Sequence, residues 1–250
     1  MSEQPESLRD QTFLRRDLSG SRFVGCDLSG VVVRGGAIGG MELDSPWLIE
    51  SGEGLVVNGV DVAPYVDEVL NRRFPGRALR TDTDPEGLRH AWAALEQAWA
   101  ATTERAQALP AGTVTESVDG EWSYLQTMRH LIMATDTWLG RAVLEREQPY
   151  DPLGLPHDDG GEGSAAYDHG MFVTQEPTLA EVLRVRGERQ AMVRDFLADA
   201  DAALLAEARK NPHAPQHEET VLSCVQTILE EEWEHHRYAV RDLDALAARG

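Results

Sequence analysis

The sequence predicts a mainly α-helical protein, a four-helix bundle preceded by a short β-solenoid and a connector. Two observations carry this prediction. Apolar residues recur at helical spacing in four segments after residue 80, and at every fifth position between residues 13 and 43. We therefore expect three regions, with residues 1–48 as the repeat segment, 49–80 as the connector and 81–250 as the bundle.

The composition is that of an ordinary globular chain, with 42% hydrophobic and 26% charged residues. The net charge of −20 disfavours non-specific binding to nucleic acid or to anionic lipid. The first residues, MSEQPESLRD, are polar, and no apolar stretch approaches the roughly 18 residues of a membrane helix. We expect a cytoplasmic protein that binds neither nucleic acid nor a membrane.

The repeat segment has a period of five. Its apolar positions are Phe13, Leu18, Phe23, Leu28, Val33, Ile38 and Leu43, and a small or turn-compatible residue follows most of them two places later. This period fits neither a helix nor a strand, so each pentad should make one side of a solenoid with its apolar residue pointing inward. A Gly-rich irregular cap is the alternative.

DLSGSRFVGCDLSGVVVRGG resembles the pentapeptide-repeat family, which implies a right-handed four-sided β-helix over about residues 11–45. So few repeats are not stable without a cap. We expect the segment to cap the bundle or to provide a surface for a homodimer. Its own charges are not acidic, which argues against a mimic of duplex DNA.

The connector contains LVVNGVDV, where an Asn-Gly pair between β-branched residues predicts a hairpin. APYVDEVLNRRFPG then predicts a short helix that ends at Pro75-Gly76.

The four bundle helices have local start signals or long apolar faces. The first begins after Asp84, and the second lies in EWSYLQTMRHLIMATDTWLGRAVL. Thr178 and Glu181 form a capping-box pattern at the start of the third, and the fourth runs from about Glu219 to Ala248. The loop 148–177 between the second and third helices is long enough to be functional.

Residues 230–238, EEEWEHHRY, contain the candidate site. Residues four apart share a helix face, so Glu232 pairs with His236 and Glu231 pairs with His235. A metal site with an open position needs a third protein ligand, which His130 on the second helix can supply. If Glu232 and His236 are the ligands, the remaining carboxylates Glu230, Glu231 and Glu234 are expected to form a solvated face.

RHLIMATDTWLGRAVL and EEEWEHHRYAVRDLDAL together resemble the DinB superfamily, including its mycothiol- and bacillithiol-dependent members. The resemblance covers about residues 81–248. It implies a four-helix bundle with a divalent metal bound by one histidine of the second helix and two ligands at i, i+4 on the fourth. By position, the implied ligands are His130, Glu232 and His236, with Glu232 where the family commonly has histidine. His235 with Glu231 is the alternative register.

Two histidines and a carboxylate suit zinc, with nickel, iron or manganese as alternatives. The resemblance implies a metal-dependent S-transferase in which a low-molecular-weight thiol such as mycothiol, or water, attacks a small electrophilic substrate. Hydrolysis or isomerisation at the same metal is an alternative reaction. A non-catalytic metal-dependent sensor and a pentapeptide-repeat interaction module are the alternative functions.

Overall fold

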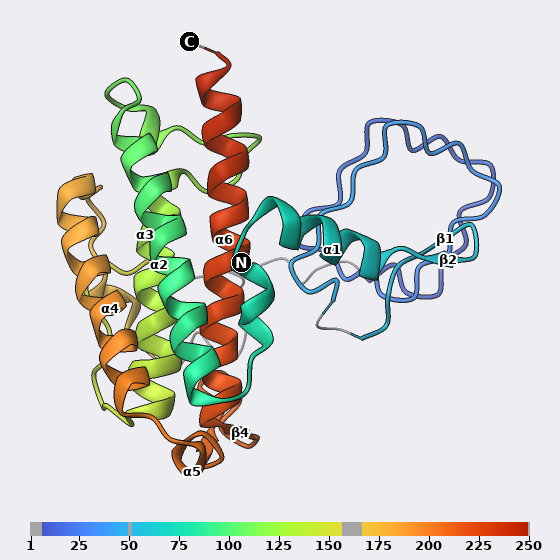
Figure 1. Ribbon diagram of the computed structural model, residues 1–250. Helices are drawn as coiled ribbons and strands as arrows, with labels where there is room; N and C mark the ends of the chain where they lie inside the picture. Colours follow the sequence, from blue (N-terminus) through green and yellow to red (C-terminus); the bar gives the residue numbers. More distant parts are fainter. Residues whose placement is uncertain (1–6, 50–51, 157–166, 250) are drawn as a thin grey trace. The chain divides into compact units, whose positions relative to one another are not determined.

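The computed structural model describes residues 7–49, 52–156 and 167–249. The chain divides into two compact units, Met1–Asp44 and Ser45–Gly250, which are described separately (Figure 1). In this division the hairpin and short helix of the connector belong to the same unit as the bundle.

Four long helices form the second unit at the predicted segments: α2 (Pro85–Gln107), α3 (Tyr124–Thr135), α4 (Leu179–Asp199) and α6 (Val221–Ala247). A π-helical segment, η3 (Asp136–Val143), continues α3. α2 and α3 each pack against both α4 and α6 (Figure 1). The predicted mainly helical fold is therefore confirmed.

Side-chain caps explain where these helices begin. Asp84 accepts hydrogen bonds from the backbone N–H groups of Glu86 and Gly87 at the start of α2. Ser123 caps α3, and Thr178 with Glu181 forms the predicted capping box of α4. These oxygens satisfy N–H groups that have no partner within the first helical turn.

Shorter elements connect the helices. β1 (Val56–Val57) and β2 (Val60–Asp61) form a hairpin at the Asn-Gly pair, and α1 (Ala63–Arg73) follows it. A second hairpin of β3 (Ala208–Lys210) and β4 (Glu218–Thr220), just before α6, was not expected from the sequence. The remaining short elements are η1 (Arg77–Thr81), η2 (Thr113–Thr115), η5 (His169–Met171) and α5 (Ala202–Leu205).

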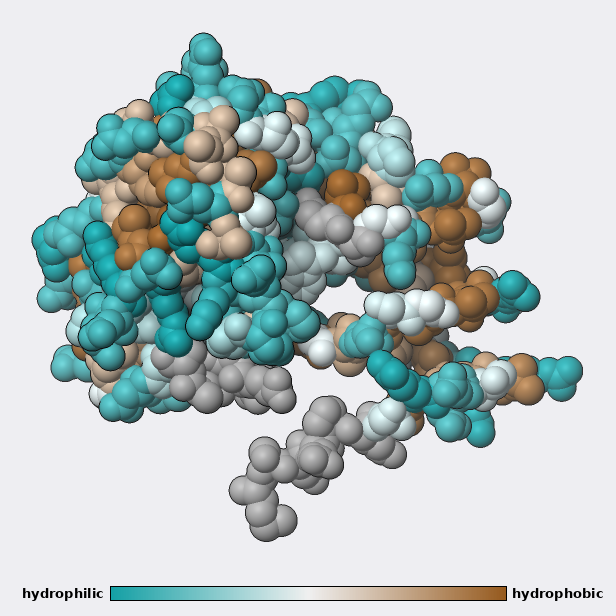
Figure 2. Space-filling view, turned by 90° about the horizontal axis from the view of Figure 1, so that it is seen from below, coloured by the Kyte–Doolittle hydropathy of each residue, from teal (hydrophilic) through white to brown (hydrophobic). Residues whose placement is uncertain are grey.

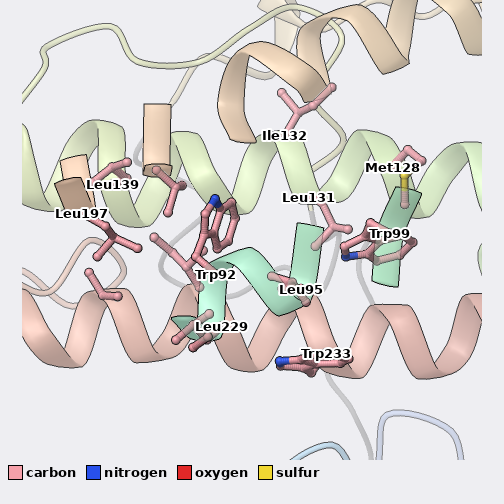
Figure 3. Close-up of a cluster of buried hydrophobic side chains, with 14 of the residues drawn as sticks. Trp92, Leu95, Trp99, Met128, Leu131, Ile132, Leu139, Leu197, Leu229 and Trp233 are labelled. Carbon is pink, nitrogen blue, oxygen red and sulfur yellow. The ribbon is translucent and has the colours of Figure 1, made fainter. Parts of the chain in front are cut away.

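The core of the bundle is built from large side chains of all four helices (Figure 3). Trp92 and Leu95 of α2 lie between Leu131 of α3 and Leu229 of α6, and each is at most 1% exposed. Burying one such side chain stabilises the fold by about 1.5–3 kcal/mol. The packing of α3 on α6 around these residues positions the candidate site.

The N-terminal unit differs from the predicted solenoid. Residues 7–44 contain no strand, and every side chain in this range is exposed. The apolar positions expected to point inward include Phe13, Phe23 and Val33, whose exposed fractions are 56%, 59% and 60%. Apolar residues reach the surface of this unit (Figure 2). With so few repeats, a coil lacks the neighbouring coils against which a solenoid buries its core.

The period of five nevertheless appears in the backbone of this unit. Gly20, Gly25, Gly30, Gly35 and Gly40 all have positive φ, between 62° and 78°. Turns closed by a backbone hydrogen bond recur every ten residues, as in Ser21 N–H to the Leu18 carbonyl and Val31 N–H to the Leu28 carbonyl. The repeat therefore determines the turns, while strand pairing between coils is not observed in residues 7–44.

Among the residues that the structure describes, no helix combines the length and the apolar character needed to cross a lipid bilayer.

Gly76 provides a test of how η1 packs on α2. Its φ is +97°, and a Cβ atom there would lie 2.7 Å from the Cβ of Ala94. We expect Gly76→Ala to lower the free energy of unfolding by about 1–3 kcal/mol, because the new side chain meets both backbone strain and a steric clash. Urea unfolding followed by circular dichroism measures this change.

The matched control is Gly187→Ala within α4, where a Cβ atom would meet nothing within 4 Å. Alanine should stabilise this helix by about 0.5–1 kcal/mol. Equal stability of the two variants would contradict the tight contact between η1 and α2.

Candidate metal centre

Three potential metal ligands from two helices converge in the second unit. They are His130 on α3 and Glu231 with His235 on α6. Oε2 of Glu231 lies 3.3 Å from Nε2 of His130 and 3.3 Å from Nε2 of His235. The three ligand atoms all lie within 4.8 Å of one another. This cluster is called the His-Glu-His cluster below.

Helix geometry explains the convergence. Glu231 and His235 are four residues apart and therefore project from one face of α6. His130 lies on the part of α3 that packs against α6, and it is 8% exposed. The side chains next to it in the sequence, Arg129 and Leu131, are also buried, so the backbone holds the imidazole close to α6.

The donor set fits a divalent cation. Two imidazoles and one carboxylate are a ligand set found in catalytic zinc sites that keep one position open. Burial alone would raise the pKa of Glu231, but hydrogen bonds from His130 and His235 outweigh it and hold this pKa well below its usual range. Glu231 is therefore ionised, which is the form that binds a metal.

A backbone carbonyl orients His130. Nδ1 of His130 lies 3.3 Å from the carbonyl oxygen of Leu155. A carbonyl can only accept a hydrogen bond, so Nδ1 carries the proton whenever this bond forms. Nε2 of the same ring faces the carboxylate oxygen Oε2 of Glu231 at 3.3 Å and donates to it when Nε2 carries the proton. With a metal on Nε2, the Leu155 carbonyl would be the second-shell partner of Nδ1 that orients the ring.

Trp122 closes one side of the cluster. Its ring stacks on His235 with a centroid distance of 5.9 Å and an angle of 17°, and it lies 4.7 Å from the His130 ring. The preceding residue, Glu121, accepts a hydrogen bond of 2.6 Å from Arg241 on α6. This bond fixes the segment that carries Trp122, which shields the two imidazoles from water on that side.

Glu232, a predicted ligand, points into the bundle instead. It is 1% exposed, and both of its carboxylate oxygens accept hydrogen bonds from Nη2 of Arg186 on α4. Successive residues of a helix are rotated by about 100°, so Glu232 and Glu231 cannot face the same neighbour. Glu232 belongs to a buried ion pair, and the structure does not bring it to His130.

His236, the other predicted ligand on α6, contacts α2. Its Nε2 lies 2.9 Å from the Thr102 hydroxyl and 3.3 Å from the Ala98 carbonyl oxygen. The ring packs edge-on against Trp99 and Trp233. Burial lowers the pKa of His236 to about 4, so the ring is neutral at physiological pH.

The predicted set of His130, Glu232 and His236 therefore does not converge. The structure brings His130 together with the pair of the alternative register, Glu231 and His235. A signal in the sequence distinguishes the two registers. Glu232 and His236 share the face of α6 that carries Leu229, Trp233 and other buried residues, whereas Glu231 and His235 lie beside that face.

The described parts of the loop 148–177 reach the cluster. Leu155 supplies the carbonyl that contacts His130, and Tyr150, Met133 and Phe172 form a small apolar cluster where the loop lies on α3. The loop thus contributes to the site through its backbone. A backbone contact of this kind leaves no residue-type signal in the sequence.

Comparison with known families identified a match over the bundle. A family model described as the DinB superfamily matches residues 94–239, more than half of the 250 residues. The matched range contains all three residues of the His-Glu-His cluster and leaves the pentapeptide-repeat segment without a family match. The comparisons with curated proteins and with solved structures found no match.

The ion pair of Glu232 leads to a prediction about stability. Glu232→Gln leaves the charge of Arg186 buried without a counter-ion, which should lower the free energy of unfolding by about 3–5 kcal/mol. Chemical denaturation of the metal-free protein measures this effect independently of any metal.

Glu188→Gln is the matched control, since Glu188 pairs with Arg184 on the exposed surface of the same helix that carries Arg186. Its effect should stay within about 0.5 kcal/mol. A Glu232→Gln variant as stable as this control would show that the buried ion pair does not hold α4 to α6.

Proposed function

Because the chain belongs to the DinB superfamily, a metal-binding family, we propose that it binds a divalent cation through Nε2 of His130, Oε2 of Glu231 and Nε2 of His235. The observation that carries this proposal is the convergence of three ligand atoms from α3 and α6 within 4.8 Å. The paired ligands on α6 and the single histidine on α3 also follow the arrangement that the family resemblance implies.

Zinc is the metal that this ligand set favours, and nickel, iron or manganese are the alternatives. Cys224 does not supply a soft ligand to the cluster, since it is buried in the core of the bundle. Three protein ligands leave a coordination position for a substrate, which distinguishes this set from a closed structural site.

The activity that we propose is S-transfer in the cytoplasm, in which the sulfur of a low-molecular-weight thiol such as mycothiol loses its proton and bonds to a carbon of a small electrophile, either displacing a leaving group or adding to an electron-poor double bond. A bound divalent cation supplies a Lewis acid that lowers the pKa of a thiol or of water at its open position, so that a nucleophile forms at neutral pH. Within the protein, Glu231 supplies negative charge and the Leu155 carbonyl orients His130. Trp122 limits access of water to the imidazoles.

Metal content tests the ligand set. Protein purified without a histidine tag and loaded with zinc should hold one equivalent, and Glu231→Gln and His235→Gln should each lose at least roughly 100-fold in affinity, more than the loss of a second-shell contact. Competition with a chromophoric chelator measures the affinity.

Two controls separate this site from the set predicted by sequence. His90→Gln changes an exposed histidine of α2 and should bind zinc like the wild type. His236→Gln should also keep its zinc, since His236 contacts Thr102. Loss of zinc in His236→Gln, with retention in His235→Gln, would restore His236 as the ligand and overturn the proposed set.

Activity is tested by incubating zinc-loaded protein with thiols and small electrophiles and following the thioether product by mass spectrometry. The expected result is turnover that disappears in His235→Gln and persists in His90→Gln. If the protein holds stoichiometric zinc but forms no product from a thiol or water and an electrophile, the transferase proposal is wrong and a metal-dependent binding protein remains.

A further inference from the structure

Arg129, the residue before the candidate ligand His130, binds backbone atoms in both described limbs of the loop 148–177, namely residues 148–156 and 167–177. Its Nε donates a hydrogen bond of 3.0 Å to the Leu153 carbonyl. Its Nη2 lies 3.4 Å from the carbonyl oxygens of both Gly154 and Val173. One guanidinium group thus holds backbone from both limbs, which are about 20 residues apart in the sequence.

Backbone hydrogen bonds complete this attachment. The Leu155 N–H donates to the carbonyl of Arg129 itself at 3.1 Å, and the Val173 N–H donates to the Pro152 carbonyl at 2.9 Å. The limb before Leu155 is also anchored, because the Asp151 N–H donates to the buried carboxylate of Asp136. The position of the Leu155 carbonyl is therefore set by contacts on both sides of it.

The chemistry of Arg129 fits this role and does not fit an ordinary ion pair. Arg129 is 9% exposed, and within the described part of the chain it forms no salt bridge, since its hydrogen-bond partners are carbonyl oxygens. A planar guanidinium offers donors in several fixed directions from three nitrogen atoms, whereas a lysine ammonium presents all of its donors from one atom. The buried charge of Arg129 is thus committed to the loop.

The Leu155 carbonyl held in this way is the acceptor for Nδ1 of His130. We propose that Arg129 is a positioning residue for the His-Glu-His cluster: by binding the loop carbonyls it keeps Leu155 against His130 and so fixes the direction of that ring. This inference rests on the proposed metal site for its consequence, but the positioning itself concerns the metal-free protein.

Amide hydrogen exchange tests the positioning directly in the metal-free protein. The Leu155 N–H, which donates to the Arg129 carbonyl, and the Val173 N–H, which donates to the Pro152 carbonyl, should be protected in the wild type. Nuclear magnetic resonance measures exchange at these single amides. Exchange of both amides at the rate of an unprotected peptide would overturn the proposal without the use of any Arg129 variant.

Variants of Arg129 test the cause. Arg129→Met keeps most of the length of the side chain but removes its donors, so the Leu155 and Val173 amides of the metal-free protein should exchange at least about 10-fold faster. Zinc affinity should fall by about 10- to 100-fold, the usual effect of losing a second-shell contact. Arg129→Lys retains a charge with fewer directed donors and should lie between Arg129→Met and the wild type.

Arg194→Met is the matched control, because Arg194 is an exposed arginine of α4 whose partner is Glu96. It should leave both the exchange of these amides and the zinc affinity unchanged. Wild-type protection of the Leu155 amide in Arg129→Met would overturn the proposal, even if zinc affinity fell, since the loss would then come from another cause. If Arg129→Met does not fold, the same two measurements on Arg129→Lys and the wild-type exchange rates decide.

The two proposals fail in different ways. Absence of zinc binding in the wild type would remove the proposed function, whereas amide exchange in the metal-free protein would still decide whether Arg129 holds Leu155 against His130. Zinc binding with unchanged amide exchange in Arg129→Met would retain the metal site and remove the role of Arg129. Faster exchange with unchanged zinc affinity would remove that role as well.

Discussion

The buried ion pair between Glu232 and Arg186 fixes the rotation of α6, and the candidate site depends on that rotation. Both residues are at most 3% exposed, and the guanidinium of α4 contacts both carboxylate oxygens of α6. Rotating α6 would separate two charges inside the core, at a cost of several kcal/mol. Because neighbouring positions differ by about 100°, the same rotation turns Glu231 towards α3.

This constraint also explains why helical spacing alone does not decide between the two registers. His130 and the two i, i+4 pairs are visible in the sequence, since helical spacing is a local property. The choice between the pairs depends on which face of α6 is buried. That face carries the buried residues Val225, Ile228, Leu229, Glu232, Trp233, His236, Ala239 and Leu243. Arg186 compensates the buried charge of Glu232. It lies 46 residues away in the sequence, so no local pattern connects the two residues.

The N-terminal unit shows the same division between local and tertiary information. Its glycines predict turns, and the backbone has positive φ at Gly20, Gly25 and Gly30 because glycine adopts this conformation at little steric cost. Burial of the apolar positions requires several stacked coils, and residues 7–44 contain too few repeats to form them. The period of five therefore predicted where the chain turns, and did not establish a packed interior.

Glu230, Glu231 and Glu234 of EEEWEHHRY were expected to form a solvated face and Glu232 to bind a metal, but in the structure Glu231, Glu232 and Glu234 each have a different partner. Glu232 binds Arg186, and Glu234 accepts hydrogen bonds of 2.8 and 2.9 Å from Arg237. Like charges this close destabilise a helix unless they are compensated, and guanidinium groups do so at any physiological pH.

Glu231 differs from Glu232 and Glu234 in the kind of partner it has. Within the described residues, its hydrogen-bond partners are the imidazoles of His130 and His235, which bind metals when they are neutral. A neutral imidazole compensates a carboxylate less than a permanent positive charge does. Of Glu231, Glu232 and Glu234, only Glu231 has no guanidinium partner within the described residues. Glu231 lies between two metal-binding side chains, where a divalent cation would supply the missing charge.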